Sequence, residues 1–439
     1  MTINRLSVRA AFLAVSSAAA VLLSATGCRH SDIVELPLTW HEGFGPFDLS
    51  FSGDRAYNPD SDASAPAITG FPDGMSEIRT GIFETNILQT CFEDHIAGRM
   101  SDERYGHLLE AWGWIPDTTV LSRNHVDTQI AFAVGKCQDG ALCIAVDTDG
   151  DSDLSDEKPL VLTETDSLFN SAERDSILSA NTVIATVEQY DGKSIKRRPL
   201  PLVLSYDSKS GIIFKGMAEH ATARHKGVEL AVRTDNLAYN FIHVTKVSGK
   251  HDWDDAQDEV FAKGDYIDIN GKMYRICGID IATNSLVLEN TGLPREKLYS
   301  SQPGFYPYPL EGPEFSSGER ISLESMKGKY VLLAFWSTGC GPCIREIPTL
   351  KELYDMTDRD SLEIIGIAGN SDPDMVKHLI GEHDIAWPQL LSTSDNDIIG
   401  TYHVNGYPTN ILIGPDGTVI TDRIYGGHIM DIASVISGK

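Results

Sequence analysis

The segment Phe335–Cys343 reads FWSTGCGPC and places two cysteines three residues apart, directly after an apolar run. The apolar residues from Val331 to Trp336 predict a buried strand. The spacing of apolar residues from Gly341 to about Asp355 predicts a helix. The cysteine pair is therefore expected at the point where a buried strand turns into a helix.

A cysteine at the start of a helix meets unpaired backbone N–H groups and the positive end of the helix dipole. Both stabilise a thiolate, which is the form that attacks a disulfide. We therefore expect Cys340 to be the catalytic nucleophile and Cys343, about one turn further in, to resolve the mixed disulfide. Pro342 fits the first helical turn, where no N–H donor is needed.

A Cys-x-x-Cys pair can also be half of a zinc site, which needs a second pair of Cys or His ligands nearby. The other cysteines lie far upstream. His378, His383 and His403 lack compact ligand spacing. Redox chemistry is therefore favoured over zinc binding.

After about residue 300 the pattern alternates between strand and helix. Strands are predicted at 331–336, 362–368, 410–413 and 418–424, with helices at 341–355, 372–383 and 429–436. This alternation predicts a C-terminal α/β domain.

With these motifs, residues from roughly Pro313 to the C-terminus resemble the thioredoxin superfamily, and within it the TlpA and ResA group of exported, membrane-tethered thiol-disulfide oxidoreductases. The resemblance rests on the Cys-Gly-Pro-Cys motif, on Pro348 after it and on Gly-Tyr-Pro-Thr at 406–409. It implies a thioredoxin-like fold and a redox-active disulfide that requires no cofactor. The implied partners are protein thiols or disulfides and an electron-donating thiol partner.

The resemblance also implies roles for single residues. Tyr407-Pro408 is expected to be a cis peptide bond beside the cysteines, with Pro408 in the catalytic set and Tyr407 and Trp336 contacting the substrate. Glu346 matches a family glutamate that tunes or relays protons near the cysteines. Spacing alone leaves open that Glu346 is a solvated helix residue.

The chain departs from the family pattern at two positions. Gly339 stands where a tryptophan usually precedes the first cysteine, and Ala334 stands where thioredoxin has a buried aspartate and many relatives have asparagine. Proton handling is then expected to fall on Glu346 or on water. A thiol peroxidase is a minor alternative, because Ser337 fits the peroxidase pattern whereas Leu333 occupies the position of its proline.

The N-terminus has a positively charged start, an apolar run from Ala10 to Leu23, and small residues that lead up to Cys28. This arrangement resembles a bacterial lipobox and predicts a signal peptide over 1–27, with Cys28 lipidated. The protein is then a lipid-anchored membrane protein of the bacterial cell envelope, facing the periplasm or the exterior. Ordinary signal cleavage and an uncleaved anchor are the alternatives.

Between these ends the sequence predicts three further segments. Residues 28–75, rich in Gly, Pro, Asp and Ser, read as a tether or irregular lead-in. Residues 76–300 read as a β-rich domain of unknown function, and residues 301–312 as a linker. The overall fold class is therefore multidomain: a β-rich N-terminal region, then the thioredoxin-like fold at 313–439.

Two features of the β-rich region suggest local chemistry. Asp147, Asp149, Asp151 and Asp153 supply alternating carboxylates that suit a structural Ca²⁺ ion, although a solvated acidic loop fits the same pattern. A turn at 138–140 makes Cys137 and Cys143 a natural disulfide across a hairpin, which leaves Cys91 to pair with Cys277. Buried free thiols are the alternative for these cysteines.

The formal net charge of −27 makes nucleic-acid binding improbable, because that function needs clustered Lys and Arg. Two functions remain. The first is an envelope thiol-disulfide oxidoreductase, favoured as a reductase of protein disulfides. The second is a lipid-anchored binding protein whose β-rich domain captures a ligand or partner, with the thioredoxin-like domain as an accessory.

Overall fold

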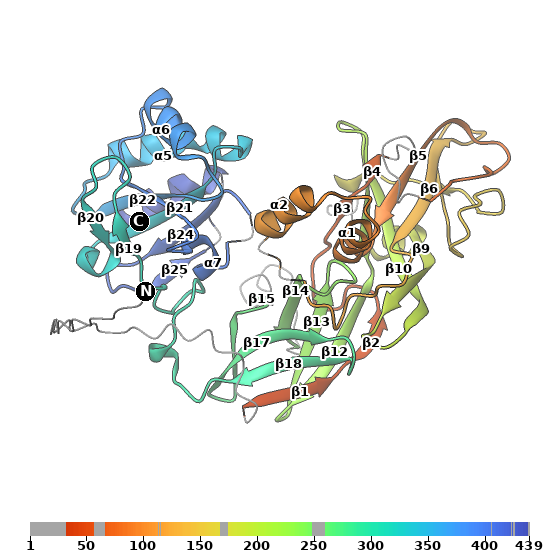
Figure 1. Ribbon diagram of the computed structural model, residues 1–439, viewed down its shortest axis with the longest axis horizontal. Helices are drawn as coiled ribbons and strands as arrows, with labels where there is room; N and C mark the ends of the chain where they lie inside the picture. The colour runs from red at the N-terminus through yellow and green to blue at the C-terminus, as the bar shows by residue number, and fades with distance from the viewer. Residues whose placement is uncertain are drawn as a thin grey trace, which may run out of the picture.

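The computed structural model describes residues 32–56, 66–112, 114, 116–166, 174–247, 260–404, 406–422, 424 and 426–437. The predicted signal peptide and Cys28 lie outside these residues. Figure 1 shows two bodies, a β-rich one coloured red to green and a C-terminal one coloured blue. Within the described residues, none of the helices has the length and apolar character needed to cross a membrane.

The β-rich body contains two antiparallel sheet pairs. In the first sandwich, one sheet has the order β1-β18-β17-β16 and the other β15-β14-β13-β12-β2, and a single apolar core lies between them. The strands are β1 (Ile33–Pro37), β2 (Thr39–Glu42), β12 (Glu219–His225), β13 (Val228–Thr234), β14 (Ile242–Lys246), β15 (Phe261–Ala262), β16 (Tyr266–Ile269), β17 (Lys272–Asp280) and β18 (Ser285–Asn290).

The second sandwich pairs a sheet of order β4-β5-β6-β7-β8 with one of order β3-β11-β10-β9, again around one shared core. The strands are β3 (Ser52–Gly53), β4 (Arg55–Ala56), β5 (Ser76–Glu84), β6 (Gln129–Lys136), β7 (Leu142–Val146), β8 (Leu160–Val161), β9 (Thr182–Tyr190), β10 (Ile195–Asp207) and β11 (Ile212–Met217). Helices α1 (Ile87–Ile96) and α2 (Asp102–Trp112) connect β5 to β6, and α4 (Arg174–Ala180) precedes β9.

The structure corrects the prediction that residues 28–75 form a tether or irregular lead-in. Residues 33–56 instead supply β1 to β4, and each of these short strands pairs with a sheet of the β-rich body. Three of the four partners, β18, β12 and β11, lie far along the chain from the strands they pair with. The local pattern of apolar residues does not reveal pairing between distant segments. The Gly and Pro residues of this segment, in contrast, predict irregular structure.

Two hairpins in the β-rich body carry clear local signals, and the second was predicted above. Asn270 and Gly271 both have positive φ angles, 56° and 76°, and they join β16 to β17 as a type I′ turn requires. Cys137 and Cys143 form a disulfide across the turn between β6 and β7. The expected pairing of Cys91 with Cys277 is wrong, because Cys91 lies on α1 beside the second sandwich whereas Cys277 lies on β17 of the first.

The segment predicted as a linker packs against the first sandwich. The Gln302 side chain accepts a hydrogen bond from the Tyr266 backbone N–H at 2.7 Å and donates one to the Tyr266 carbonyl at 3.0 Å. The ring of Phe305 stacks on that of Tyr266. Residues 302–305 are therefore held to β16 by both polar and apolar contacts.

The C-terminal body is a five-stranded sheet of order β23-β22-β21-β24-β25. β21 runs parallel to β22 and antiparallel to β24. Separate apolar cores cover the two faces, so alternate residues of β21 pack on opposite sides. The strands are β19 (Glu311–Pro313), β20 (Arg320–Ser322), β21 (Tyr330–Trp336), β22 (Leu362–Ala368), β23 (Gln389–Leu391), β24 (Thr409–Ile413) and β25 (Val419–Thr421).

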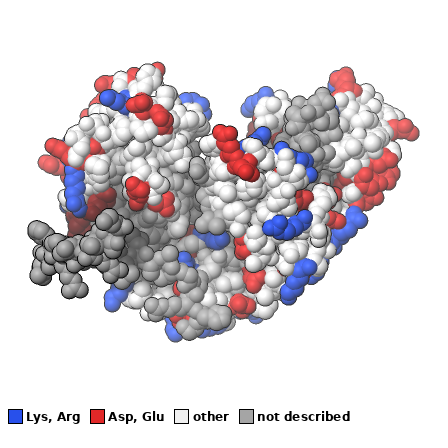
Figure 2. Space-filling view, in the orientation of Figure 1, with Lys and Arg blue, Asp and Glu red and all other residues white. Residues whose placement is uncertain are grey.

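Helices of this body are α5 (Gly341–Met356), α6 (Pro373–Glu382), α7 (Ile398–Thr401) and α8 (Asp431–Ser437), with 3₁₀ turns η2 (Arg295–Lys297) before the domain and η3 (Leu323–Met326) and η4 (Gly426–Met430) within it. The predicted multidomain class is thus confirmed. On the face seen in Figure 2, Lys and Arg side chains are scattered among Asp and Glu, and a hollow separates the two bodies at the upper edge.

Candidate active site: a disulfide at the start of helix α5

The two cysteines of the Cys-Gly-Pro-Cys motif form a disulfide where β21 passes into α5. Cys340 is the N-cap residue of α5, and its Sγ atom accepts a hydrogen bond from the Cys343 backbone N–H at 3.1 Å. Cys343 is buried, with 3% of its surface exposed, whereas Cys340 is partly exposed. An incoming thiol or disulfide therefore meets Cys340 before Cys343.

The electrostatic setting favours a negative sulfur at Cys340. The first turn of α5 contains no acidic residue, so nothing within that turn opposes the positive end of the helix dipole. Gly339, exposed and with no atom within 4 Å of the position a Cβ would take, leaves the approach to Cys340 open.

The Tyr407–Pro408 peptide bond is cis, as the resemblance predicted. Tyr407 packs against the apolar cluster that contains Cys343 and that Cys340 also joins, and Pro408 lines a cavity together with Cys343. Burial raises the pKa of the Tyr407 hydroxyl. The structure thus brings this segment beside the disulfide, while substrate contact by Tyr407 stays a prediction.

The structure corrects the expected role of Trp336. Its side chain is only 8% exposed, and its indole N–H donates a hydrogen bond of 2.9 Å to Oε1 of Gln389. The indole therefore lies within the domain, beneath the disulfide, and is not available to contact a substrate. A buried indole N–H group needs a hydrogen-bond acceptor, and Gln389 on β23 supplies it.

Glu346 lies one turn after Cys343 on α5 and is 7% exposed, so the alternative of a solvated helix residue is wrong. One carboxylate oxygen accepts a hydrogen bond from Nδ2 of Asn410 at 3.1 Å. The other accepts one from the Gly426 backbone N–H at 3.0 Å. The carboxylate is thus held by two donors in the wall of a cavity that Cys343 also lines, and its part in proton transfer stays a prediction.

Sequence reasoning missed Asn410 and Gln389. Both amides are buried and line the same cavity as Cys343. A signal existed for Asn410, which is a polar residue at the start of the apolar run Ile411–Ile413 and directly follows the Pro408-Thr409 pair. Gln389 carried no comparable signal, because its strand has only three residues.

The structure brings together three of the four carboxylates proposed for calcium. Ligand atoms of Asp147, Asp149 and Asp151 lie within 4.8 Å of one another, and Asp153 is not in this group. The Asp147 carboxylate is buried and already accepts hydrogen bonds from three backbone N–H groups, at residues 150, 151 and 152. Calcium binding at this loop stays a prediction.

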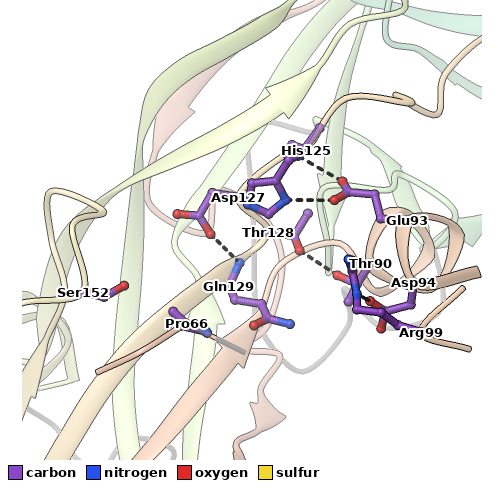
Figure 3. A pocket seen from close by; sticks show the side chains of 11 residues that line it. Pro66, Thr90, Glu93, Asp94, Arg99, His125, Asp127, Thr128, Gln129 and Ser152 are labelled. Carbon is purple, nitrogen blue, oxygen red and sulfur yellow. Dashed lines mark hydrogen bonds and ion pairs between the residues drawn. The ribbon is translucent and has the colours of Figure 1, made fainter. Parts of the chain in front are cut away.

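The β-rich body has a polar pocket of about 210 Å³ between α1 and the start of β6. Figure 3 shows the Glu93 and His125 side chains turned toward each other, with Nδ1 of His125 2.8 Å from a Glu93 oxygen. Asp127 lies in the same pocket, and burial, reinforced by Glu188, raises the pKa of its carboxyl group. Sequence analysis identified none of these residues.

Comparison with known proteins matches residues 310–421 to the AhpC/TSA family. The thiol-disulfide oxidoreductase ResA of Bacillus cereus is 38% identical over 109 residues, which cover 25% of this chain and 62% of ResA. ResA of Bacillus subtilis is 33% identical over 107 residues, 24% of this chain and 59% of ResA. The chain thus spans less than two thirds of these relatives.

Among solved structures, the thioredoxin domain of a thiol-disulfide oxidoreductase from Bacteroides vulgatus is similar. It is 28% identical, with a TM-score of 0.29, and the match covers 30% of this chain and 96% of that domain. The family match over residues 310–421 covers the sheet that carries the cysteine pair. Residues 310–421 therefore form a thioredoxin-like domain that is similar to the AhpC/TSA family, and a β-rich region precedes it.

Proposed function

We propose that this chain is a thiol-disulfide oxidoreductase that reduces protein disulfides through Cys340 and Cys343. In the dithiol form, the Cys340 thiolate attacks one sulfur of a substrate disulfide, and the other substrate sulfur leaves as a thiolate. Cys343 then attacks Cys340, which forms the enzyme disulfide and releases the second substrate sulfur. Two electrons pass to the substrate, and an electron-donating thiol partner restores the dithiol.

The observation that carries this proposal is the unequal placement of the two sulfurs. Cys340 is partly exposed at the helix start, where backbone N–H groups stabilise its thiolate, whereas Cys343 is buried behind it. A nucleophile must reach its substrate, and a resolving thiol must reach only the nucleophile. The similarity to proteins named thiol-disulfide oxidoreductase ResA supports the same chemistry.

Replacing Cys340 tests the proposal. In the full chain, Cys340→Ser is expected to abolish reduction of insulin disulfides, because serine cannot form the mixed disulfide. Cys277→Ser, on β17, makes the same substitution outside the C-terminal body and is expected to leave the rate unchanged. Retained insulin reduction in Cys340→Ser would refute the mechanism, and hydrogen peroxide turnover without disulfide exchange would favour the peroxidase alternative.

We also propose that Cys28 carries a lipid that anchors the protein in the bacterial cell envelope. The support is the sequence before Cys28, with its charged start, apolar run and small residues. Cells that express the chain are expected to incorporate labelled fatty acid into the protein and to keep it in the membrane fraction. Both properties should be lost in Cys28→Ser, and membrane retention without label would point to an uncleaved anchor instead.

Ligand capture by the β-rich region is the second candidate, and the pocket of Figure 3 favours it. Besides His125, the pocket contains Glu93, Asp127 and an Arg99–Asp94 ion pair, so its ionisable groups favour a cationic ligand. We expect binding of a small diamine such as putrescine to be weakened at least tenfold by Asp127→Asn, measured by calorimetry. Equal binding by Asp127→Asn and the unchanged chain would exclude this pocket.

A further inference from the structure

A second pocket of the β-rich body lies where its two sandwiches meet. The pocket has a volume of about 420 Å³, which is in the range of small-molecule sites. Residues of β3, β11 and the end of β5 form one wall, which belongs to the second sandwich. The end of β13 and the loop that follows it form the other wall, which belongs to the first sandwich. None of the residues that line this pocket also lines the pocket of Figure 3.

Lys215 occupies an apolar position in this pocket. On β11 it alternates with Ile213 and Met217, which belong to the core of the second sandwich, and alternate residues of a strand share one face. Its opposite neighbour on β10, Leu204, is part of the same core. Only 4% of Lys215 is exposed. Lysine is almost never buried to this degree unless its charge is paired, so this position calls for a partner.

The protein supplies the Lys215 ammonium group with few partners. Nζ donates a hydrogen bond of 3.0 Å to Oγ of Ser52, and no ion pair joins it to a residue that the structure describes. Burial lowers the pKa of Lys215 to about 8, although the charges of Glu84 and Asp235 oppose this shift. An ammonium group has three N–H donors, so two of them lack an acceptor within the described part of the chain.

A second buried cation, Arg233, lines the opposite wall. It is 8% exposed, and its guanidinium lies over the ring of Phe47 and donates to the Asp48 carbonyl oxygen. Its Nε atom is buried and has no hydrogen-bond partner among the described residues. Buried donors nearly always have a partner. Cationic side chains on both walls of the pocket therefore have N–H groups to offer.

The two carboxylates that line the pocket already have partners. Glu84 accepts a hydrogen bond from the Asn86 backbone N–H at 3.1 Å. Asp235 pairs with His243 at 3.1 Å and with Arg233 at 3.4 Å. Lys215 is thus the charged group of this pocket that has no ion-pair partner among the described residues, and the ligand that matches it is an anion.

The rest of the pocket lining is largely apolar. Phe51 and Phe241 contribute aromatic rings, and Ile87 and Met217 add aliphatic surface. Phe241 is 48% exposed, so its ring can contact a ligand. Aromatic rings pack favourably against one another, so this lining favours an aromatic group on the ligand.

We propose that this pocket binds a small aromatic carboxylate, whose charged group bonds Lys215 and Arg233 and whose ring packs between Phe51 and Phe241. A carboxylate has two oxygens that accept several hydrogen bonds at once, so it can serve donors on both walls. The inference concerns the β-rich body and does not depend on the thiol chemistry proposed for Cys340.

Calorimetry on the full chain tests the proposal with three probes that share one apolar body: phenylbutyrate, phenylbutanol and phenylbutylamine. The unchanged chain is expected to bind phenylbutyrate more tightly than the other two by about tenfold or more. Lys215→Met replaces the cation by an apolar side chain that suits this face of β11, and the preference should disappear. Lys209→Met, in the exposed turn between β10 and β11, is the matched control and should keep the preference.

A preference for phenylbutyrate that survives in Lys215→Met would overturn the inference. Equal binding of the acid and the alcohol by the unchanged chain, or no binding of the acid, would overturn it as well. None of these outcomes involves insulin reduction, so they are distinguishable from a failure of the proposed thiol chemistry.

A labelling experiment on the unchanged chain covers the case in which Lys215→Met does not fold. Phenylbutyrate is expected to slow acetylation of Lys215 and to leave that of Lys209 unchanged, as measured by peptide mass spectrometry. Acetylation of Lys215 at the same rate with and without phenylbutyrate would contradict the proposal.

Discussion

The chain contains two disulfides in different settings. Cys340–Cys343 lies at a strand-to-helix junction, with Cys340 at the helix N-cap and the buried Glu346 one turn after Cys343. Cys137–Cys143 closes the hairpin between β6 and β7, and Cys143 lies in the ladder opposite Gly135 with none of its surface exposed. Backbone N–H groups and a buried carboxylate therefore lie near the Cys340–Cys343 disulfide, whereas the Cys137–Cys143 disulfide lies at a β-ladder. We therefore propose a redox role for the first pair and a structural role for the second.

Among the residues around the first disulfide, the largest effect is expected from replacing Glu346, the predicted proton acceptor. Glu346→Gln keeps the shape of the side chain but cannot accept the Cys343 proton. Insulin reduction at neutral pH is expected to fall by about 100-fold, within the range for general acid–base groups. A rate within a factor of about two of the unchanged chain would show that water alone handles the proton.

Removing the second disulfide should change stability and not exchange. The double variant Cys137→Ser, Cys143→Ser opens a short loop, which costs about 2 kcal/mol of unfolding free energy in the chain-entropy model. Urea unfolding measures the loss, and insulin reduction by the same sample should match that of the unchanged chain. A fall in exchange rate would mean that the hairpin disulfide takes part in electron transfer, and the contrast between the two pairs would be lost.

A smaller effect is expected at Trp336, beneath the first disulfide. Trp336→Phe removes the donor to Gln389 and leaves a buried amide oxygen without its partner, which costs about 1 kcal/mol of stability. Because the indole is buried, KM for a protein disulfide should not change. Raised KM at unchanged stability would restore the original prediction that Trp336 contacts the substrate.

The sequence was sufficient where a local pattern carries the chemistry. The strand and the helix start follow from short motifs and their spacing, and the cis bond at Tyr407–Pro408 follows from the family resemblance. It was insufficient where pairing joins distant segments, as with β1 to β4 and with the Asn410–Glu346 bond, whose partners are 64 residues apart. Trp336 shows a third limit. The sequence next to the motif does not reveal whether the indole N–H group bonds a residue within the domain, such as Gln389, or faces a substrate.

Trapping the mixed disulfide tests the central claim most directly. The variant Cys343→Ser retains the nucleophile but lacks the resolving thiol, so the attack on a protein disulfide should stop at the first step. After incubation of the reduced full-length variant with insulin, peptide mass spectrometry is expected to find the insulin chain bound to Cys340. Insulin bound at Cys137 or Cys143, or no adduct on a folded variant, would contradict the assignment of redox work to the disulfide at α5.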